Sequence, residues 1–264
     1  MNNKIKKENY NMKRILKKLI DPKFLLSIPS RIKYILIRFY HEKILFKSAS
    51  KEVIFTSIWK INYWGNHESL SGIGSTLEQT EKLREQLPNM FFKFGINSVF
   101  DAPCGDLNWM QHILKKGGFN YLGGDIVSAI VEKNNKKFSN QNVNFIKFDI
   151  TRDTFPIADL WICRAVLYHL SNLDIYLALE KFTESKIKYI LTTNCVTDNN
   201  HVNKDIHTGD WRSLNLTLPP FNFPKDPLWE IDDYVDPHPP MTISLWTKEQ
   251  VESVLPNLRK IYKH

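Results

Sequence analysis

Two hydrophobic patterns alternate through the middle of the chain. Short apolar runs, typical of buried strands, are followed by stretches in which apolar residues recur three and four positions apart, as on one face of a helix. We predict strands at 98–101, 121–125, 143–149, 159–163 and 189–193, with helices at about 108–116, 128–138 and 174–183. Strands that alternate with helices form right-handed βαβ units. The expected fold is therefore a doubly wound α/β domain with a mostly parallel sheet.

The segments that flank this core are less regular. Residues 76–87 are predicted to form an amphipathic helix that Ser75 caps and Pro88 ends. Residues 198–246 have little periodicity and hold seven of the 13 prolines together with several aromatic residues. Long loops in compact domains usually serve binding, so we expect a rigid, folded loop that contributes to a site. A last helix is predicted at 247–255, followed by a short apolar piece.

The first 50 residues form a separate basic segment. They hold 13 Lys and Arg against three acids, a net charge of +10, which leaves −2 for residues 51–264. Apolar residues in 12–20 and in 31–46 follow a helical period, so we expect a basic helical arm followed by one domain at 51–264. This arm either lies on an anionic membrane surface or packs on the domain with its basic face in water.

The composition is that of an ordinary globular protein, with 42% hydrophobic and 24% charged residues. No stretch has the roughly 20 apolar residues of a membrane-spanning helix, and no secretory signal is recognised. The three cysteines are too few and too widely separated for a disulfide framework or a zinc site, so no metal site is predicted. The expected location is the cytoplasm, or the inner face of the cytoplasmic membrane if the arm binds lipid.

Three successive strands of the predicted sheet end in aspartate. Asp101 ends the first and is followed by Gly105 in the strand-to-helix turn, Asp125 ends the second, and Asp149 ends the third. Ligands of such sheets bind at the carboxyl ends of the strands, and an acid about 20 residues after the glycine turn accepts hydrogen bonds from ribose hydroxyls. The three aspartates therefore outline a nucleoside pocket.

A dinucleotide-binding dehydrogenase would use a similar arrangement but fits less well. Its pyrophosphate needs a glycine-rich turn at a helix N-terminus, whereas this turn has one glycine and carries Asp106, a negative charge against the phosphates. S-adenosylmethionine has a sulfonium cation and no phosphate. The acid-rich, glycine-poor crevice therefore favours S-adenosylmethionine.

At these positions the sequence resembles the class I S-adenosylmethionine-dependent methyltransferases, over about residues 98–193. The resemblance implies a Rossmann-like fold in which the first strand's acid and turn, the second strand's acid and the third strand's Asp hold the cofactor, while the fourth strand ends beside the methyl donor. Pro103 and Leu107 stand where the family commonly has glycines. The implied cofactor-binding residues are Asp101, Ala102, Pro103, Gly105, Asp125, Ile126, Asp149, Ile150, Cys163 and Arg164.

A second resemblance covers about residues 64–246. A Trp-Gly pair at Trp64 and the stretch Ser71–Leu77 upstream of Asp101 are similar to a bacterial subgroup of these methyltransferases associated with surface-polysaccharide and lipopolysaccharide synthesis. It implies a sugar hydroxyl as acceptor, on a glycan, a sugar nucleotide or a lipid-linked sugar. Ser71 and Gly74 then belong to a loop that folds over the cofactor with its amides near the donor's carboxylate; the alternative is an ordinary Ser/Gly loop with a helix cap.

Removal of the hydroxyl proton requires a base. We predict His207, between Asp205 and Asp210 in the loop after the fifth strand, because neighbouring acids raise the pKa of a histidine and orient its ring. His169, after the fourth strand, is the second candidate. Three functional alternatives stay open: a cofactor-binding domain without catalysis, a small-molecule methyltransferase, and a nucleic-acid methyltransferase, which the net charge of −2 disfavours.

Overall fold

The computed structural model describes residues 30–198, 200–236 and 238–262, so the helix predicted at 12–20 lies outside the described residues. The chain divides into two compact units, residues 1–50 and 51–264. In the first unit, α3 (Ser30–Tyr40), a π-helical turn (His41–Leu45) and α4 (Phe46–Ser48) follow one another without a break. The helix expected at 31–46 is thus confirmed.

The second unit is built on a seven-stranded sheet with the order β3-β2-β1-β4-β5-β7-β6. The strands β1 to β5 pair in parallel, and β7 runs antiparallel to both of its neighbours. This confirms the doubly wound, mostly parallel sheet. The strands are β1 (Ser98–Asp101), β2 (Asn120–Asp125), β3 (Val143–Lys147), β4 (Leu160–Cys163), β5 (Tyr189–Cys195), β6 (Trp229–Asp232) and β7 (Met241–Thr247).

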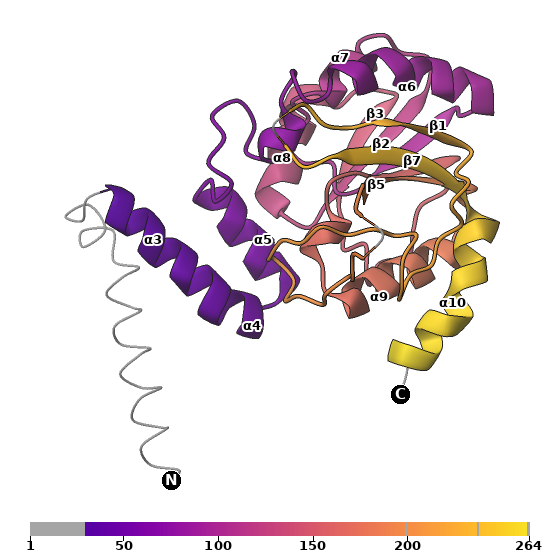
Figure 1. Ribbon diagram of the computed structural model, residues 1–264. Helices are drawn as coiled ribbons and strands as arrows, with labels where there is room; N and C mark the ends of the chain where they lie inside the picture. The colour runs from indigo at the N-terminus through magenta and orange to yellow at the C-terminus, as the bar shows by residue number, and fades with distance from the viewer. Residues whose placement is uncertain (1–29, 199, 237, 263–264) are drawn as a thin grey trace. The chain divides into compact units, whose positions relative to one another are not determined.

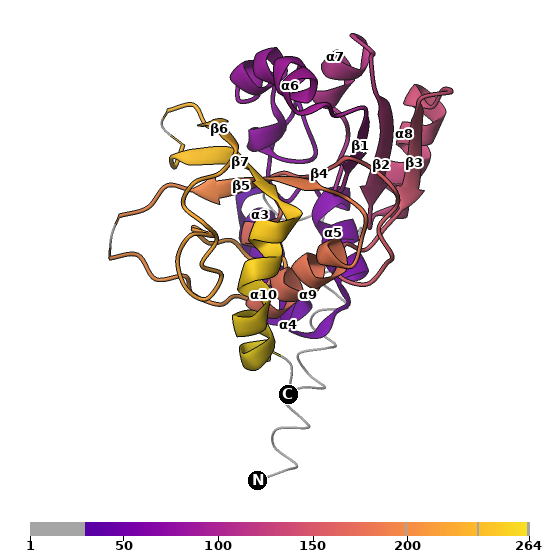
Figure 2. The same cartoon turned by 90° about the vertical axis from the view of Figure 1, so that its right-hand side faces the viewer.

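Helices cover both faces of this sheet (Figures 1 and 2). The helices α6 and α7 lie on one face and α9 and α10 on the other, and α8 follows β2. The helices of the second unit are α5 (Lys51–Lys60), α6 (Glu81–Phe94), α7 (Met110–Leu114), α8 (Ser128–Phe138), α9 (Asn172–Thr183) and α10 (Lys248–Tyr262), with 3-10 turns at Ile73–Ser75 and Leu167–His169.

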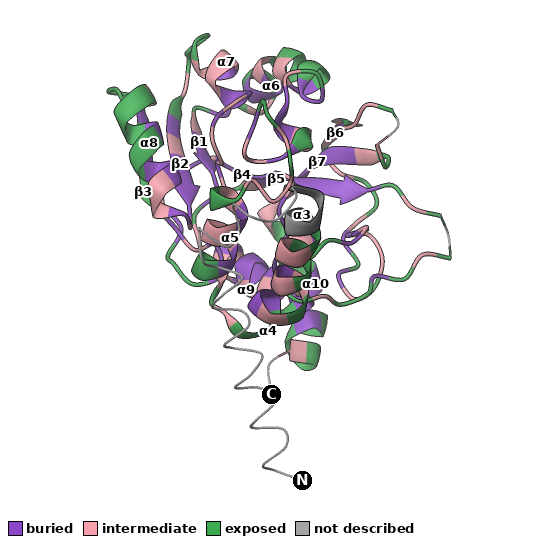
Figure 3. Ribbon diagram, turned by 90° about the vertical axis from the view of Figure 1, so that its left-hand side faces the viewer, coloured by how far each residue is buried: buried purple, intermediate pink, exposed green. Residues whose placement is uncertain are grey.

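Alternate side chains of each central strand enter different cores, as strand geometry requires. On β4, Trp161 and Cys163 pack with α9 and α10, whereas Leu160 and Ile162 pack with α6 and α7. The central strands are consequently buried along most of their length (Figure 3). A ligand can therefore reach the sheet at the carboxyl ends of β1, β2 and β4.

The prediction for the helix before β1 is wrong at both ends. The helix begins at Glu81, with Thr80 rather than Ser75 at its N-cap, and it continues through Pro88 to Phe94. Proline removes one backbone donor, which leaves the carbonyl four residues earlier without its usual partner. Here that carbonyl, Arg84 O, accepts from Lys116 Nζ at 3.5 Å. The helix ends at Gly95, which has a positive φ of 63°.

The C-terminal part is more regular than the sequence indicated. The segment 198–246, expected to be a long loop, contains β6 and most of β7, so the antiparallel strand of the sheet precedes the last helix. The helix predicted at 247–255 extends to Tyr262 as α10. The helix α5 was not predicted at all. In the described part of the chain, no helix combines the length and the apolar character needed to cross a bilayer.

Candidate functional site

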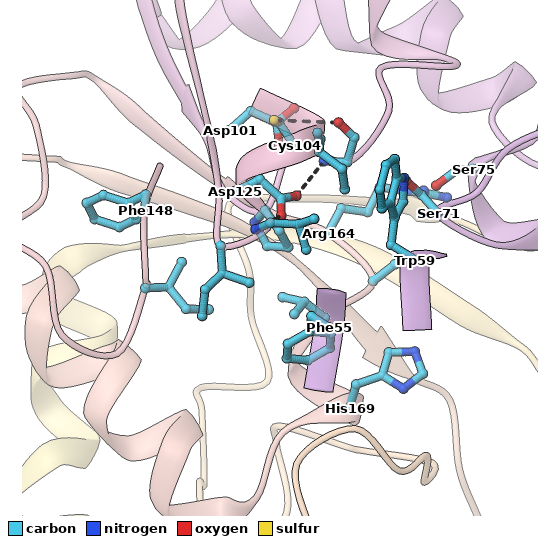
Figure 4. Close-up of a pocket in the computed structure, with 18 of the residues that line it drawn as sticks. Phe55, Trp59, Ser71, Ser75, Asp101, Cys104, Asp125, Phe148, Arg164 and His169 are labelled. Atoms are coloured by element: carbon cyan, nitrogen blue, oxygen red, sulfur yellow. Dashed lines mark hydrogen bonds between the residues drawn. The ribbon is translucent and has the colours of Figure 1, made fainter. Parts of the chain in front are cut away.

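A cavity opens at the carboxyl ends of β1, β2 and β4, with an empty volume of about 1030 Å³ that includes the open solvent at its mouth. Asp101, Cys104 and Asp125 lie close to the strand ends, and Phe55 and Trp59 come from α5 (Figure 4). Nine residues that the sequence predicted for cofactor binding line this cavity: Ser71, Asp101, Pro103, Gly105, Asp125, Ile126, Asp149, Ile150 and Arg164.

Three other predicted residues lie elsewhere. Ala102 and Cys163 are fully buried core residues on the face of the sheet that packs against α9 and α10. Gly74 lines a second cavity that adjoins the first. The expectation that Ala102 and Cys163 line the crevice is therefore corrected: both are buried in the core, while their neighbours Asp101, Pro103 and Arg164 line the cavity.

Asp125 is held rigidly by the backbone around it. Its Oδ2 accepts from the Gly105 amide at 3.1 Å, and its Oδ1 accepts from the Val127 amide at 2.9 Å. Burial raises the pKa of this carboxyl to about 6, although the two amides partly offset the effect. A fixed carboxylate at the end of β2 is suited to accept hydrogen bonds from a ligand's hydroxyls.

Asp101 lies deeper, at the end of β1, and is 3% exposed. The Tyr121 hydroxyl donates to its Oδ2 at 2.6 Å. Burial dominates and raises the pKa of Asp101 to about 7, while the Tyr121 hydrogen bond and the charge of Arg164 act in the opposite direction. A cation bound in the cavity would stabilise the ionised form of both buried carboxyls.

The turn after β1 approaches the upstream loop so closely that a side chain at Gly105 would not fit. Gly105 has φ +57°, and a Cβ there would lie 2.3 Å from Ser71 Oγ. Ser71 in turn accepts from the Asp106 amide at 3.1 Å, and the Asp106 carboxylate accepts from Ser69 Oγ and the Leu70 amide at 2.9 and 2.8 Å. Asp106 thus ties the upstream loop to the turn after β1, and Ser71 and Gly105 on either side of this contact line the cavity.

Asp149, in the segment after β3, accepts hydrogen bonds from a residue of its own turn. Its Oδ1 accepts from the Thr151 amide at 2.9 Å and from the Thr151 hydroxyl at 2.7 Å. Phe148 and Ile150 on either side also line the cavity. This part of the site therefore offers an apolar slot with one carboxylate at its rim.

The two cations in the lining are each paired with a carboxylate that does not line this cavity. Arg164 donates to Asp233 from Nε at 2.9 Å and from Nη2 at 2.8 Å, and both side chains are almost completely buried. Lys51 Nζ lies 2.9 Å from Asp174 Oδ1. Because both cations are already neutralised, Asp101, Asp125 and Asp149 give the cavity its negative charge.

A second cavity shares five lining residues with the first. Its remaining wall comes from the loop before α6, from the connection between β6 and β7, and from Tyr168, Thr193, Trp211 and Met241. The shared residues are Trp64, Ser71, Arg164, Ala165 and His169. Ala165 adopts a positive φ of 57°, a strained conformation for alanine, and its amide donates to Thr193 Oγ1 at 2.9 Å. The geometry thus provides two chambers with a common junction.

His169 lies at this junction, with its ring against those of Trp64 and Tyr168. Its Nδ1 is 2.8 Å from the carbonyl oxygen of Asp210. A carbonyl only accepts, so Nδ1 carries the proton, and Nε2 of the neutral ring keeps a lone pair. Burial lowers the pKa of His169 to about 4, which keeps the ring neutral near pH 7.

The base predicted first, His207, does not reach either cavity. Its side chain is exposed, and neither it nor Asp205 or Asp210 lines either of these two cavities. Asp205 instead accepts from the Asn172 amide at 2.8 Å, at the beginning of α9. The expectation that this trio faces the crevice is corrected, because the loop turns its carboxylates toward backbone amides.

Several lining residues were not identified from the sequence. Phe55 and Trp59 stand four residues apart on α5, a spacing that could have revealed the helix. Asp233, the partner of Arg164, follows β6 in a segment that was taken for a loop. Its contact spans 69 positions in the chain, and no local pattern indicates such a pairing.

No protein-family model matches this chain, and no curated protein matches it in sequence. Solved structures do resemble it. A SAM-dependent methyltransferase of Leishmania major has a TM-score of 0.54 at 13% identity, covering 74% of this chain and 83% of that one. The magnesium protoporphyrin IX methyltransferase of Synechocystis PCC 6803 with bound SAM has a TM-score of 0.52 at 12% identity, covering 75% and 97%. At such identities the likeness shows the fold, which is the Rossmann-like methyltransferase fold.

Proposed function

We propose that this protein is an S-adenosylmethionine-dependent methyltransferase. The observation that carries the proposal is the charge of the first cavity: three carboxylates line it, while both of its cations are neutralised by Asp174 and Asp233. S-adenosylmethionine carries a sulfonium, an ammonium and one carboxylate, so its net charge is positive and complements this lining. The three carboxylates would repel a pyrophosphate. Two structural neighbours are named as methyltransferases, which adds support.

The residues present fit this cofactor. Asp125, fixed by two backbone amides, would accept hydrogen bonds from the ribose hydroxyls. Phe148, Ile150 and the rim carboxylate of Asp149 would hold the adenine. Asp101 would face the positively charged groups of the cofactor. The bound cofactor would supply an electrophilic methyl group, and this chain's residues would orient it and exclude water.

The acceptor that we propose is a hydroxyl of a bacterial surface-glycan sugar, presented as a glycan, a sugar nucleotide or a lipid-linked sugar. The resemblance over residues 64–246 motivates it, and the second cavity offers the space beside the first. An acceptor there would meet the donor at the shared junction, which would bring the two reactants close together, as methyl transfer requires.

We assign the proton-accepting role to His169. It is the histidine that lines both cavities, and its Nδ1 hydrogen bond to Asp210 fixes the ring with the lone pair on Nε2. Its low pKa keeps it unprotonated, at the cost of lower basicity. Asp210 contributes through its backbone carbonyl, which orients the ring.

Mass spectrometry of the surface glycan tests the function. Glycan from cells with the protein should be heavier by one methylene group per modified sugar than glycan from cells without it. Complementation with the His169→Ala variant should not restore that mass. A non-catalytic binding domain is the alternative: it predicts tight cofactor binding and identical glycan masses in all three strains.

A further inference from the structure

The second cavity differs from the first in charge. Of the four residue types Lys, Arg, Asp and Glu, the described lining contains Arg164 and Asp233. These two side chains form a bidentate ion pair with each other. Their side chains are 5% and 2% exposed, so neither is available to a ligand without breaking the pair. The cavity is therefore polar but carries no unpaired formal charge from these residue types.

Neutral hydrogen-bonding groups surround this pair. The Tyr168 and Tyr234 hydroxyls and the Trp211 indole N–H have no hydrogen-bond partner within the described chain, although their residues line the cavity. Gln79 accepts from the Val235 amide through Oε1, which leaves its NH₂ group as a donor. The tyrosine hydroxyls can donate or accept, whereas the Trp211 N–H and the Gln79 NH₂ group donate, so all of them can pair with the hydroxyls of a ligand.

Trp211 adds an apolar surface. It is 46% exposed, an unusual degree for so large an apolar side chain, and it lies in the same lining as the neutral polar groups. An aromatic face beside hydroxyl-binding groups suits a ring that has hydroxyls at its edge and C–H groups on its face.

We propose that the second cavity binds an uncharged, polyhydroxylated ring, such as a neutral hexose, and excludes rings that carry a carboxylate or phosphate. This rests on the proposed function, since it specifies the acceptor of that reaction. Burying an anion beside a pair that is already neutralised would leave it without a partner, which is strongly unfavourable. The restriction concerns the ring that enters: a diphosphate or lipid attached to it can remain outside.

Calorimetric titration at about pH 8, where imidazoles are neutral, tests the proposal. The full chain is first saturated with S-adenosylhomocysteine and then titrated with methyl mannoside, methyl glucuronide, mannose 6-phosphate and phenol. We expect the neutral glycoside to bind most tightly. The Trp211→Ala variant should bind it about 2- to 12-fold more weakly, the range for a lost aromatic contact, with unchanged affinity for S-adenosylhomocysteine. Phe92→Ala, on the exposed side of α6, is the matched control and should bind like the wild type.

A second variant tests the charge argument directly. Asp233→Asn leaves Arg164 without its anionic partner, so the preference should shift toward the glucuronide relative to the neutral glycoside. The proposal is overturned if the glucuronide or the phosphate binds wild-type protein as well as the neutral sugar, if phenol binds best, or if no neutral sugar binds while S-adenosylhomocysteine does. Failure of S-adenosylhomocysteine to bind would instead refute the proposed function itself, so the two failures are distinguishable.

Discussion

Acidification should weaken the binding of S-adenosylmethionine, because two buried carboxyls in its cavity are protonated more easily than usual. Burial raises the pKa of Asp101 to about 7 and that of Asp125 to about 6 in the free protein. A bound cation and donating ribose hydroxyls both favour the ionised carboxylates, so the pKa values fall on binding. Binding therefore releases protons, and affinity must rise with pH through this range.

The expected size of this pH effect follows from the pKa values of Asp101 and Asp125. If both carboxyls are ionised in the complex, affinity should fall about 100-fold between about pH 7.5 and about pH 5.5. Asp101 accounts for most of this change because its pKa is the higher of the two. In the Asp101→Asn variant the dependence that remains comes from Asp125 and should be only about fourfold.

Calorimetric titration across this pH range is the assay, with buffers of different ionisation enthalpy to count the protons released. Wild-type protein should release protons near pH 6.5, and the Asp101→Asn variant should release fewer. An affinity that is independent of pH, or one that increases on acidification, would refute the reasoning. An equal pH dependence in the variant would show that Asp101 does not contact the cationic ligand.

Three other predictions concern single features of the chain. Gly105→Ala should lower the free energy of unfolding by about 2 kcal/mol or more in urea titrations, since it strains φ and displaces Ser71, and Ser71→Gly in the same chain should recover the steric part. His169→Ala should lower kcat by about 10² to 10⁴, while His207→Ala should keep a kcat near that of the wild type. The opposite ranking would identify His207, in the loop after β5, as the base. Deletion of residues 1–50 should abolish sedimentation with anionic liposomes, and equal sedimentation of both chains would leave the arm with a packing role.

The strand ends could be predicted because they depend on local patterns. A buried apolar run followed by Asp is typical of the carboxyl end of a strand, so the sequence alone predicts Asp101, Asp125 and Asp149 at one edge of the sheet, and all three line the first cavity. The same logic fails for neighbouring positions. Proximity in sequence assigns Ala102, directly after β1, and Cys163, at the end of β4, to the site, yet both are buried in the core.

Long-range contacts account for most of what the sequence could not reveal. Pro88 is typical of a helix end, but Lys116, in the turn after α7, supplies a donor to the carbonyl that the proline leaves without a partner. His207 looks like a base oriented by acids, but Asp205 is used to bind the backbone amide of Asn172. Both errors arose because a local pattern was read without the tertiary partner that decides its role.

The measurement that tests the central claim most directly is a calorimetric comparison of S-adenosylmethionine, S-adenosylhomocysteine and NAD on wild-type protein and the Asp125→Ala variant. We predict that wild-type protein binds the first two and not NAD. The variant should lose about 1.5 to 3 kcal/mol of binding free energy, the range for a hydrogen bond to a charged group, which is about 10- to 150-fold in affinity. Binding of NAD without binding of S-adenosylhomocysteine, or equal affinities in wild type and variant, would contradict the assignment of this cavity.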